Sequence, residues 1–159
     1  MTKAEILTLM KEKGKSDALD LRSRAKDLDG TAIIAEESKI PQFDPNKDYS
    51  SWAVGSPVYE IVDGERQVFG LIQPHNASYY PGSTPSNTRA LWSLKHTKDA
   101  AKAKPWVAPL GTSGMYMKDE VCKHTDKVWR SKQDNNPYEP GVTGTDNFWE
   151  AVMISRRGK

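Results

Sequence analysis

Apolar and polar residues follow two different patterns along this chain, and the change falls near residue 40. Before it, apolar residues recur at the three- and four-residue spacing of helices. Thr2 and Glu5 have the spacing of a capping box in front of Ile6, and Gly14 is placed to end a helix. The pattern therefore predicts a first short helix that stops at Gly14.

A second short helix is predicted to begin at Ser16 and to end at Gly30. Its apolar residues form one stripe of the helical surface: Ala18, Leu21, Ala25 and Leu28. Helices this short are marginal in water on their own. We therefore expect residues 1–40 to be a helical docking segment that packs against the rest of the chain or against another protein.

After residue 40, short apolar alternations are separated by Pro, Gly, Asn and Asp, which is typical of small strands and long turns. Asp63-Gly64 is a favoured turn pair for a hairpin. Strands are predicted at 57–62, 67–72, 90–94, 115–122, 127–132 and 148–154. The predicted fold class is α+β, mainly β, with two short N-terminal helices followed by two small three-stranded antiparallel β modules.

The two predicted modules have the same order of parts, which indicates an internal repeat. Phe69 would match Trp129, and Trp92 would match Trp149, while Asn76 and Asn135 lie in the corresponding loops. Chance similarity between two small hairpin units is the alternative. The chain is accordingly divided into the helical segment 1–40, a first module at 41–96, a linker or bridging arm at 97–112 and a second module at 113–155.

Composition narrows the function classes. The 23 basic and 21 acidic residues give a net charge of +2, which does not indicate a nucleic-acid partner. No apolar run is long enough for a membrane span or a secretory signal, so neither is expected. A single cysteine, Cys122, precludes an internal disulfide and suits a reducing compartment.

The histidines and the cysteine, which often act in catalysis or bind metals, show no pattern typical of an active site. His75, His96 and His124 are too widely spaced in the sequence to form a metal-binding motif. Cys122 and His124 would share one strand face, but no third group is placed to orient them. We therefore expect a protein that is not an enzyme and that has no cofactor and no metal.

Two loops combine tyrosines with amides, which suits sugar binding, because a ring can face the C–H groups of a pyranose while amides bond its hydroxyls. The candidate binding residues are His75, Asn76, Tyr79 and Tyr80 in the first module and Asn135 and Tyr138 in the second. The same tyrosines would also suit a protein interface. Trp92, Trp129 and Trp149 lie in predicted strands and are expected to be structural.

The second module carries an ordered set of residues: Tyr116, Val121, Val128, Trp129, Arg130, Pro140 and Trp149. This set resembles the small chitin- and cellulose-binding modules of carbohydrate-binding families 5 and 12. The resemblance implies a small β module that binds polysaccharide. The chain departs from those families at Asp119-Glu120, where they have Gly-Asp, and at 132–134, where they have paired exposed aromatics.

Segments 28–34, 40–45, 72–77, 89–92 and 104–107 are similar to a group of small proteins encoded by tailed bacteriophages and prophages of Gram-positive bacteria. The resemblance implies a non-enzymatic virion structural protein, at a tail tip or fibre or decorating a capsid, made in the bacterial host cytoplasm. Many copies per particle would contact other virion proteins through the N-terminal helices and bind cell-surface polysaccharide weakly. The alternatives are a pure assembly module without sugar binding and a carbohydrate-targeting accessory of a cell-wall hydrolase.

Overall fold

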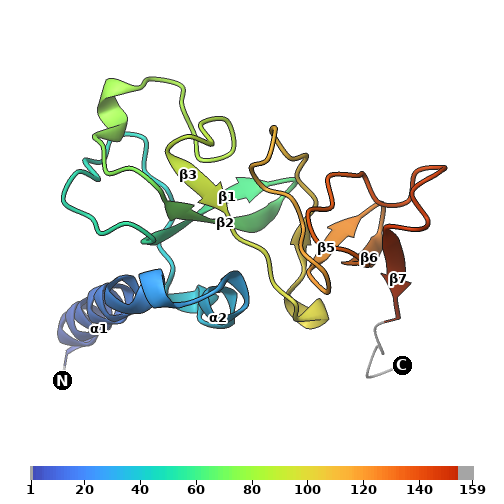
Figure 1. The fold of residues 1–159 in the computed structure, drawn as a ribbon. Coiled ribbons are helices and arrows are strands. Elements are labelled where there is room, and N and C mark those ends of the chain that lie inside the picture. Colours follow the sequence, from blue (N-terminus) through green and yellow to red (C-terminus); the bar gives the residue numbers. More distant parts are fainter. Residues whose placement is uncertain (1, 154–159) are drawn as a thin grey trace.

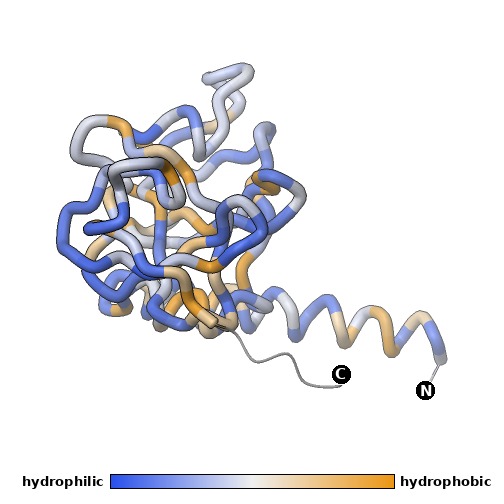
Figure 2. The backbone as a smooth tube through the Cα atoms, turned by 90° about the vertical axis from the view of Figure 1, so that its right-hand side faces the viewer, coloured by the Kyte–Doolittle hydropathy of each residue, from blue (hydrophilic) through white to orange (hydrophobic). Residues whose placement is uncertain are grey.

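The computed structural model describes residues 2–153, which form one long helix, several short helical turns and two β sheets (Figure 1). The predicted α+β class is therefore confirmed. The long helix lies at one end of the molecule, and its N-terminal half projects away from the rest (Figures 1 and 2). None of the helices in the described part of the chain combines the length and apolar character that crossing a membrane demands.

The long helix α1 runs without a break over Lys3–Arg24. The predicted capping box is present, because the Thr2 hydroxyl accepts from the Glu5 N–H at 3.1 Å and the Glu5 carboxylate accepts from the Thr2 N–H at 2.9 Å. The prediction of two short helices separated at Gly14 is wrong. A glycine inside a helix costs only about 1 kcal/mol, and the lysines and glutamate around it are good helix formers.

Three short helical elements follow α1: η1 (Ala25–Asp27), α2 (Gly30–Ala35) and η2 (Glu37–Lys39). The turns η1 and η2 contact α1, and α2 shares a buried cluster with it. Gly30 begins α2 instead of ending the helix before it, because the Asp29 carboxylate accepts from the Ala32 N–H at 2.8 Å and caps α2. The predicted apolar stripe is confirmed at its centre. Its buried members share one cluster with residues from α2 and the first sheet: Leu21, Ala25, Ile33, Ile34, Ile40 and Val68.

The first sheet is antiparallel and contains β1 (Pro57–Val62), β2 (Glu65–Leu71) and β3 (Trp92–Leu94), in the order β1-β2-β3. Asp63 and Gly64 join β1 to β2 with φ angles of 51° and 78°, the left-handed geometry that a two-residue hairpin turn requires. The loop between β2 and β3 contains a single helical turn, η3 (Ala77–Tyr79). This sheet therefore follows the prediction.

The second sheet has four strands, not three: β4 (Lys104–Pro105), β5 (Val121–His124), β6 (Lys127–Ser131) and β7 (Trp149–Val152), in that order. The extra strand β4, which follows the helical turn η4 (Ala100–Lys102), pairs in parallel with β5. Two residues show no alternation, so the sequence pattern did not reveal this strand. Ile154, the predicted end of the last strand, lies outside the described residues, and the proposed domain boundaries stay predictions.

The two sheets have equivalent hydrogen bonds at corresponding positions. In the first, the Leu71 N–H donates to the Ser56 carbonyl at 2.9 Å, and in the second the Ser131 N–H donates to the Glu120 carbonyl at 2.8 Å. The register pairs Leu71 with Trp92 and Ser131 with Trp149, so the two tryptophans occupy equivalent places. The expected matches of Trp92 with Trp149, and of Phe69 with Trp129, agree with this register.

The loops that follow β2 and β6 also correspond. Asn76 accepts from the Ser78 N–H at 3.0 Å, and Asn136 accepts from the Tyr138 N–H at 3.2 Å. The equivalent of Asn76 is therefore Asn136, one residue beyond Asn135, which the predicted internal repeat matches with Asn76.

The modules and the helical segment pack on one another. The Gln67 side chain, which is buried, donates to the Pro105 carbonyl at 2.7 Å, and Lys123 pairs with Glu65 at 2.6 Å. Gly30 lies so close to the chain at His96 that an added Cβ would meet the His96 carbonyl oxygen at 2.1 Å. These contacts fix the two sheets relative to each other and to α2.

Candidate functional site

The first candidate loop follows β2 and is shaped by Asn76. The Asn76 carboxamide oxygen accepts from the Ser78 N–H at 3.0 Å and from the Ser78 hydroxyl at 2.6 Å, which starts the turn η3. This turn presents Tyr79, whose side chain is 78% exposed, and Tyr80, which is 47% exposed. The structure therefore gives Asn76 a turn-forming role and leaves both tyrosine rings accessible.

His75 connects this loop to the core of the first module. Its ring lies 5.6 Å from the ring of Trp92 and 5.8 Å from that of Tyr80, in both cases nearly perpendicular. Its Nδ1 is 2.8 Å from the Gln73 carbonyl. His75 and Tyr80 are thus held together on top of the buried Trp92, whereas Tyr79 stands apart from these rings.

The second candidate loop follows β6. The Tyr138 ring is 42% exposed and stacks on Phe148, with centroids 4.1 Å apart and planes 23° from parallel. Asn135 is exposed in the left-handed region at φ 52°. In the described part of the chain, the ring contacts of each loop stay within its own module. The structure therefore brings His75 and Tyr80 together, leaves Tyr79 apart in the same loop, and joins none of them to Tyr138.

Sequence reasoning missed Asn136, the buried residue that organises the second loop. Its carboxamide nitrogen donates to the Ser131 hydroxyl at 3.0 Å and to the Phe148 carbonyl at 2.8 Å. The signal was available, because Asn136 follows Gln133 at the same distance as Asn76 follows Gln73.

The tryptophans are structural to different degrees. Trp92 and Trp149 are buried, at 1% and 3% exposure, whereas Trp129 is half-buried against the second core. Trp52 packs on the first core, with the Arg22 guanidinium 4.1 Å from its ring centroid. Trp106 packs on the second core beside His124.

The histidines and the cysteine sit in separate environments. His75 belongs to the first module, and His124 at the end of β5 contacts Glu139 at 3.1 Å. His96 is buried and stacks on Tyr116 at 3.7 Å, and this burial lowers its pKa to about 4. Burial raises the pKa of the Cys122 thiol, which makes it a poor nucleophile. Among residues 2–153, no three potential ligand side chains gather as they would around a metal ion.

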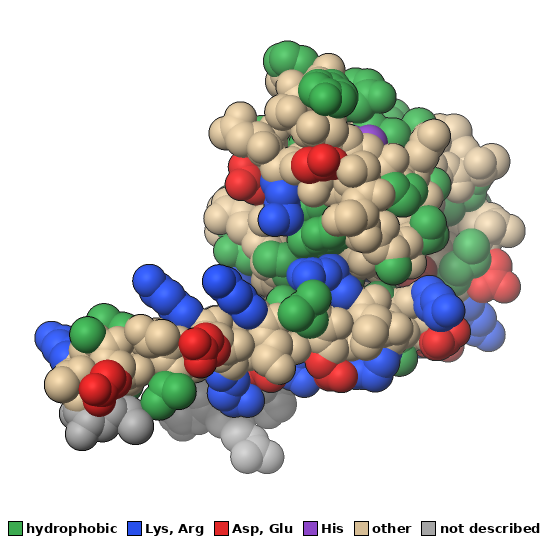
Figure 3. Space-filling view, turned by 90° about the vertical axis from the view of Figure 1, so that its left-hand side faces the viewer, with side chains coloured by type: hydrophobic (Ala, Val, Ile, Leu, Met, Phe, Trp, Pro, Cys, Tyr) green, Lys and Arg blue, Asp and Glu red, His purple; other side chains and the backbone are tan. Residues whose placement is uncertain are grey.

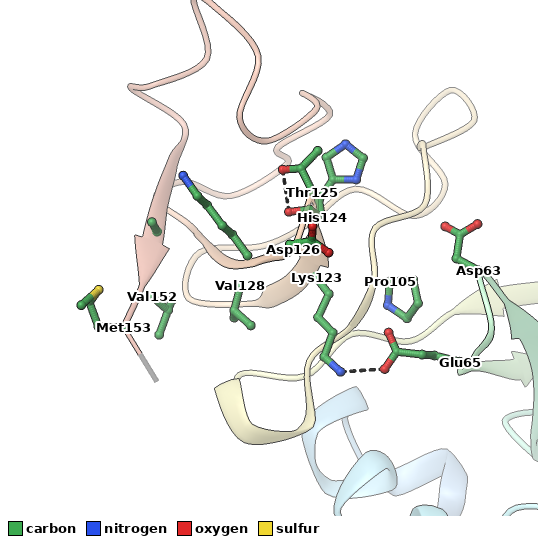
Figure 4. A pocket seen from close by; sticks show the side chains of 12 residues that line it. Asp63, Glu65, Pro105, Lys123, His124, Thr125, Asp126, Val128, Val152 and Met153 are labelled. Carbon is green, nitrogen blue, oxygen red and sulfur yellow. Dashed lines mark hydrogen bonds and ion pairs between the residues drawn. The ribbon is translucent and has the colours of Figure 1, made fainter. Parts of the chain in front are cut away.

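A hollow of about 870 Å³ lies between the first hairpin turn and the second sheet (Figure 4). Lys123 and Glu65 point toward each other in it and form the ion pair described above. His124 also lines the hollow and is paired with Glu139. Lys123, Glu65 and His124 are therefore already engaged within the chain.

The projecting half of α1 is the most conspicuous unpartnered surface. Every residue from Thr2 to Ser16 is exposed, among them the apolar side chains of Ile6, Leu7, Leu9 and Met10, at 45% to 65%. Figure 3 shows this arm reaching out beneath an open corner, into which basic side chains project. The corner has a volume of about 670 Å³ and is lined mainly by α1 and the segment before β1, including Lys11, Lys15, Arg22, Lys47 and Trp52.

In comparisons with known proteins, no protein-family model matches the chain, and no curated protein sequence matches it.

Proposed function

We propose that this chain is a non-enzymatic structural protein of a bacteriophage particle, and that the projecting half of α1 is its assembly element. The observation that carries the proposal is the set of exposed apolar side chains on that half: Ile6, Leu7, Leu9 and Met10. An isolated helix of this length is marginal in water, and apolar residues on it gain stability when another protein covers them. The sequence resemblance to small phage proteins supplies the setting.

The rest of the fold suits such a part. The Arg22 contact with Trp52 and the buried Leu21 fix the base of α1 on the body, so the arm has a defined direction. The β modules lie on the far side of this base (Figure 1). Once the arm is anchored, they would face away from the anchoring protein.

A glycan-binding role for the modules is a second candidate, favoured by the exposure of Tyr79, Tyr80 and Tyr138. Each loop offers only one or two rings, so each site would be weak. Many copies on one particle would raise the overall affinity without any new contact.

The assembly role is tested by the double variant Leu7→Lys with Met10→Lys, introduced into the phage genome. Purified particles are analysed by quantitative mass spectrometry for the copy number of the chain. Wild-type particles should contain the chain in many copies, and the variant should be depleted by roughly tenfold or more, because lysines would be buried in an apolar contact. Two single variants serve as a matched comparison. Met10→Lys and Thr8→Lys add the same charge on opposite faces of the helix, and only the Met10→Lys chain should be depleted from the particles. Absence of the chain from wild-type particles would overturn the proposal.

A further inference from the structure

The projecting part of α1 carries a stripe that is complementary to itself, and we propose that it pairs antiparallel with the same stripe of a second copy of this chain. The proposal rests on α1 being the assembly element and names its partner. The stripe consists of residues spaced by three or four along the helix: Lys3, Ile6, Leu7, Met10, Gly14 and Asp17.

The stripe continues the face by which α1 already packs. Leu21 and Ala25, the next residues in this spacing, are buried in the core beneath α2. The same helix face is thus covered by the body at its C-terminal end, half-buried at Asp17, and uncovered from Lys3 to Gly14, where Leu7 is 51% and Met10 65% exposed. A partner helix laid along this face would extend an existing apolar contact.

The length of the uncovered part fits a two-helix contact. From Lys3 to Asp17 the helix rises about 21 Å, and the first buried residue, Leu21, follows one turn later. A second helix that runs antiparallel along this stretch would end near the body of the first copy. The two bodies would then lie at opposite ends of the pair and would not overlap.

A symmetric pair centred on Met10 gives a specific register. It places Met10 against the Met10 of the second copy and Ile6 against Gly14, each equally far from the centre. A Cβ added at Gly14 would meet no atom within 4 Å, so the space that the Ile6 side chain would fill is open. The residue that looked like a helix stop is in this register the hole for an apolar side chain.

The charges at the ends of the stripe select the same register. Lys3 falls opposite Asp17, so the pair would gain a cation–anion contact at each end. Asp17, whose side chain is 34% exposed, already contacts Lys13 of its own helix at 3.4 Å, so Lys3 of the second copy would be its second cation. Shifting the centre from Met10 to Leu7 would instead oppose Lys3 with Lys11. This self-complementarity favours a second copy over an unrelated partner.

The test is a cysteine variant of the whole chain. Met10→Cys places one thiol at the centre of the pair, and mild oxidation should convert most of the protein to a disulfide-linked dimer. Thr8→Cys, on the opposite face, should stay monomeric on a non-reducing gel. Cys122 is fully buried and should not interfere. Equal cross-linking of the two variants, or none in either, would overturn the antiparallel pair.

A charge exchange tests the register in solution. The wild-type chain should sediment at twice its 17.8 kDa at sufficient concentration. Lys3→Glu or Asp17→Lys alone should raise the dimer dissociation constant about threefold, and the double variant should restore it. Monomeric wild-type protein at all concentrations, together with loss of the Met10→Lys chain from particles, would refute self-pairing and leave the assembly role of α1 in place.

Discussion

The guanidinium of Arg22 lies over the indole of Trp52, with its central carbon 4.1 Å from the ring centroid. Arg22 belongs to α1, and Trp52 belongs to the segment that leads into the first sheet. The contact therefore ties the projecting helix to the β body and sets the direction of the arm. It also gives Trp52 a role that composition alone could not assign.

Removing this contact should weaken the protein modestly. Arg22→Ala is expected to lower the free energy of unfolding by about 1 kcal/mol, because a partly exposed cation–π contact and its packing are lost. Urea denaturation followed by tryptophan fluorescence measures this change. Lys15→Ala, on the same helix, serves as the control and should change stability little. Equal effects of the two variants would show that the ring contact carries no stability.

Two glycine variants should have opposite effects. Gly30→Ala is expected to destabilise the protein by roughly 3 kcal/mol, because its Cβ would meet the His96 carbonyl oxygen at 2.1 Å and backbone would have to move. Gly14→Ala meets nothing within 4 Å and should stabilise α1 locally by about 1 kcal/mol. Thermal unfolding measures the first effect, and far-ultraviolet circular dichroism measures the second as increased helix content. A silent Gly30→Ala variant would contradict the close packing of α2 against the segment at His96.

Acid should destabilise the protein through His96. Burial against Tyr116 lowers the pKa of His96 from 6.5 to about 4, so the unfolded chain binds the proton more tightly than the folded one. The contribution of His96 to stability should therefore be constant above pH 6.5 and be lost between pH 6.5 and 4, a total on the order of 3 kcal/mol. The Arg24 ion pair lowers the pKa of Glu36 to about 2, so its contribution is lost only at lower pH.

Urea titrations at several pH values measure this dependence. His96→Gln should have a lower stability at neutral pH and a flatter profile between pH 6.5 and 4. An unchanged slope in that variant would assign the acid sensitivity to another group.

Most strands of the sheets could be predicted because they depend on residue patterns and turns that are close together in the sequence. Alternating residues and the Asp63-Gly64 turn define the first hairpin, and the repeated order of residues places Trp92 and Trp149 in equivalent cores. A helix stop at Gly14 does not form, because the effect of one glycine on a helix depends on its neighbours. Strand β4 was missed because its two residues are defined only by pairing with β5, which is distant in the sequence.

In the candidate loops, too, features set by nearby residues could be predicted, and features set by distant contacts could not. The exposure of Tyr79 follows from its polar, proline-rich surroundings and could be anticipated. The packing of His75 on Trp92 depends on a contact between separate segments, which residue patterns do not specify, whereas the place of Asn136 could have been found from its spacing after Gln133.

The Cys122 thiol should be inert in the folded protein. Burial raises its pKa, so thiolate is scarce and a reagent cannot reach it. Ellman's reagent should titrate less than a tenth of an equivalent in buffer and about one equivalent in concentrated urea. Fast reaction without urea would contradict the enclosed second core.

At Tyr79, an effect on glycan binding can be measured without an effect on protein stability. Because this side chain is 78% exposed, Tyr79→Ala should leave the melting temperature nearly unchanged. The triple variant with Tyr80→Ala and Tyr138→Ala should lose retention on purified cell walls if the loops bind polysaccharide. Wild-type protein that is not retained would eliminate sugar binding and leave the pure assembly role.

Electron cryomicroscopy of the intact phage particle would show whether the chain is a virion part held by α1. We expect density for this fold at a capsid or tail position, with residues 3–17 covered by protein and the loops at Tyr79 and Tyr138 facing outward. A particle that lacks this density, or one in which the helix projects into solvent while the β modules make the contacts, would contradict it.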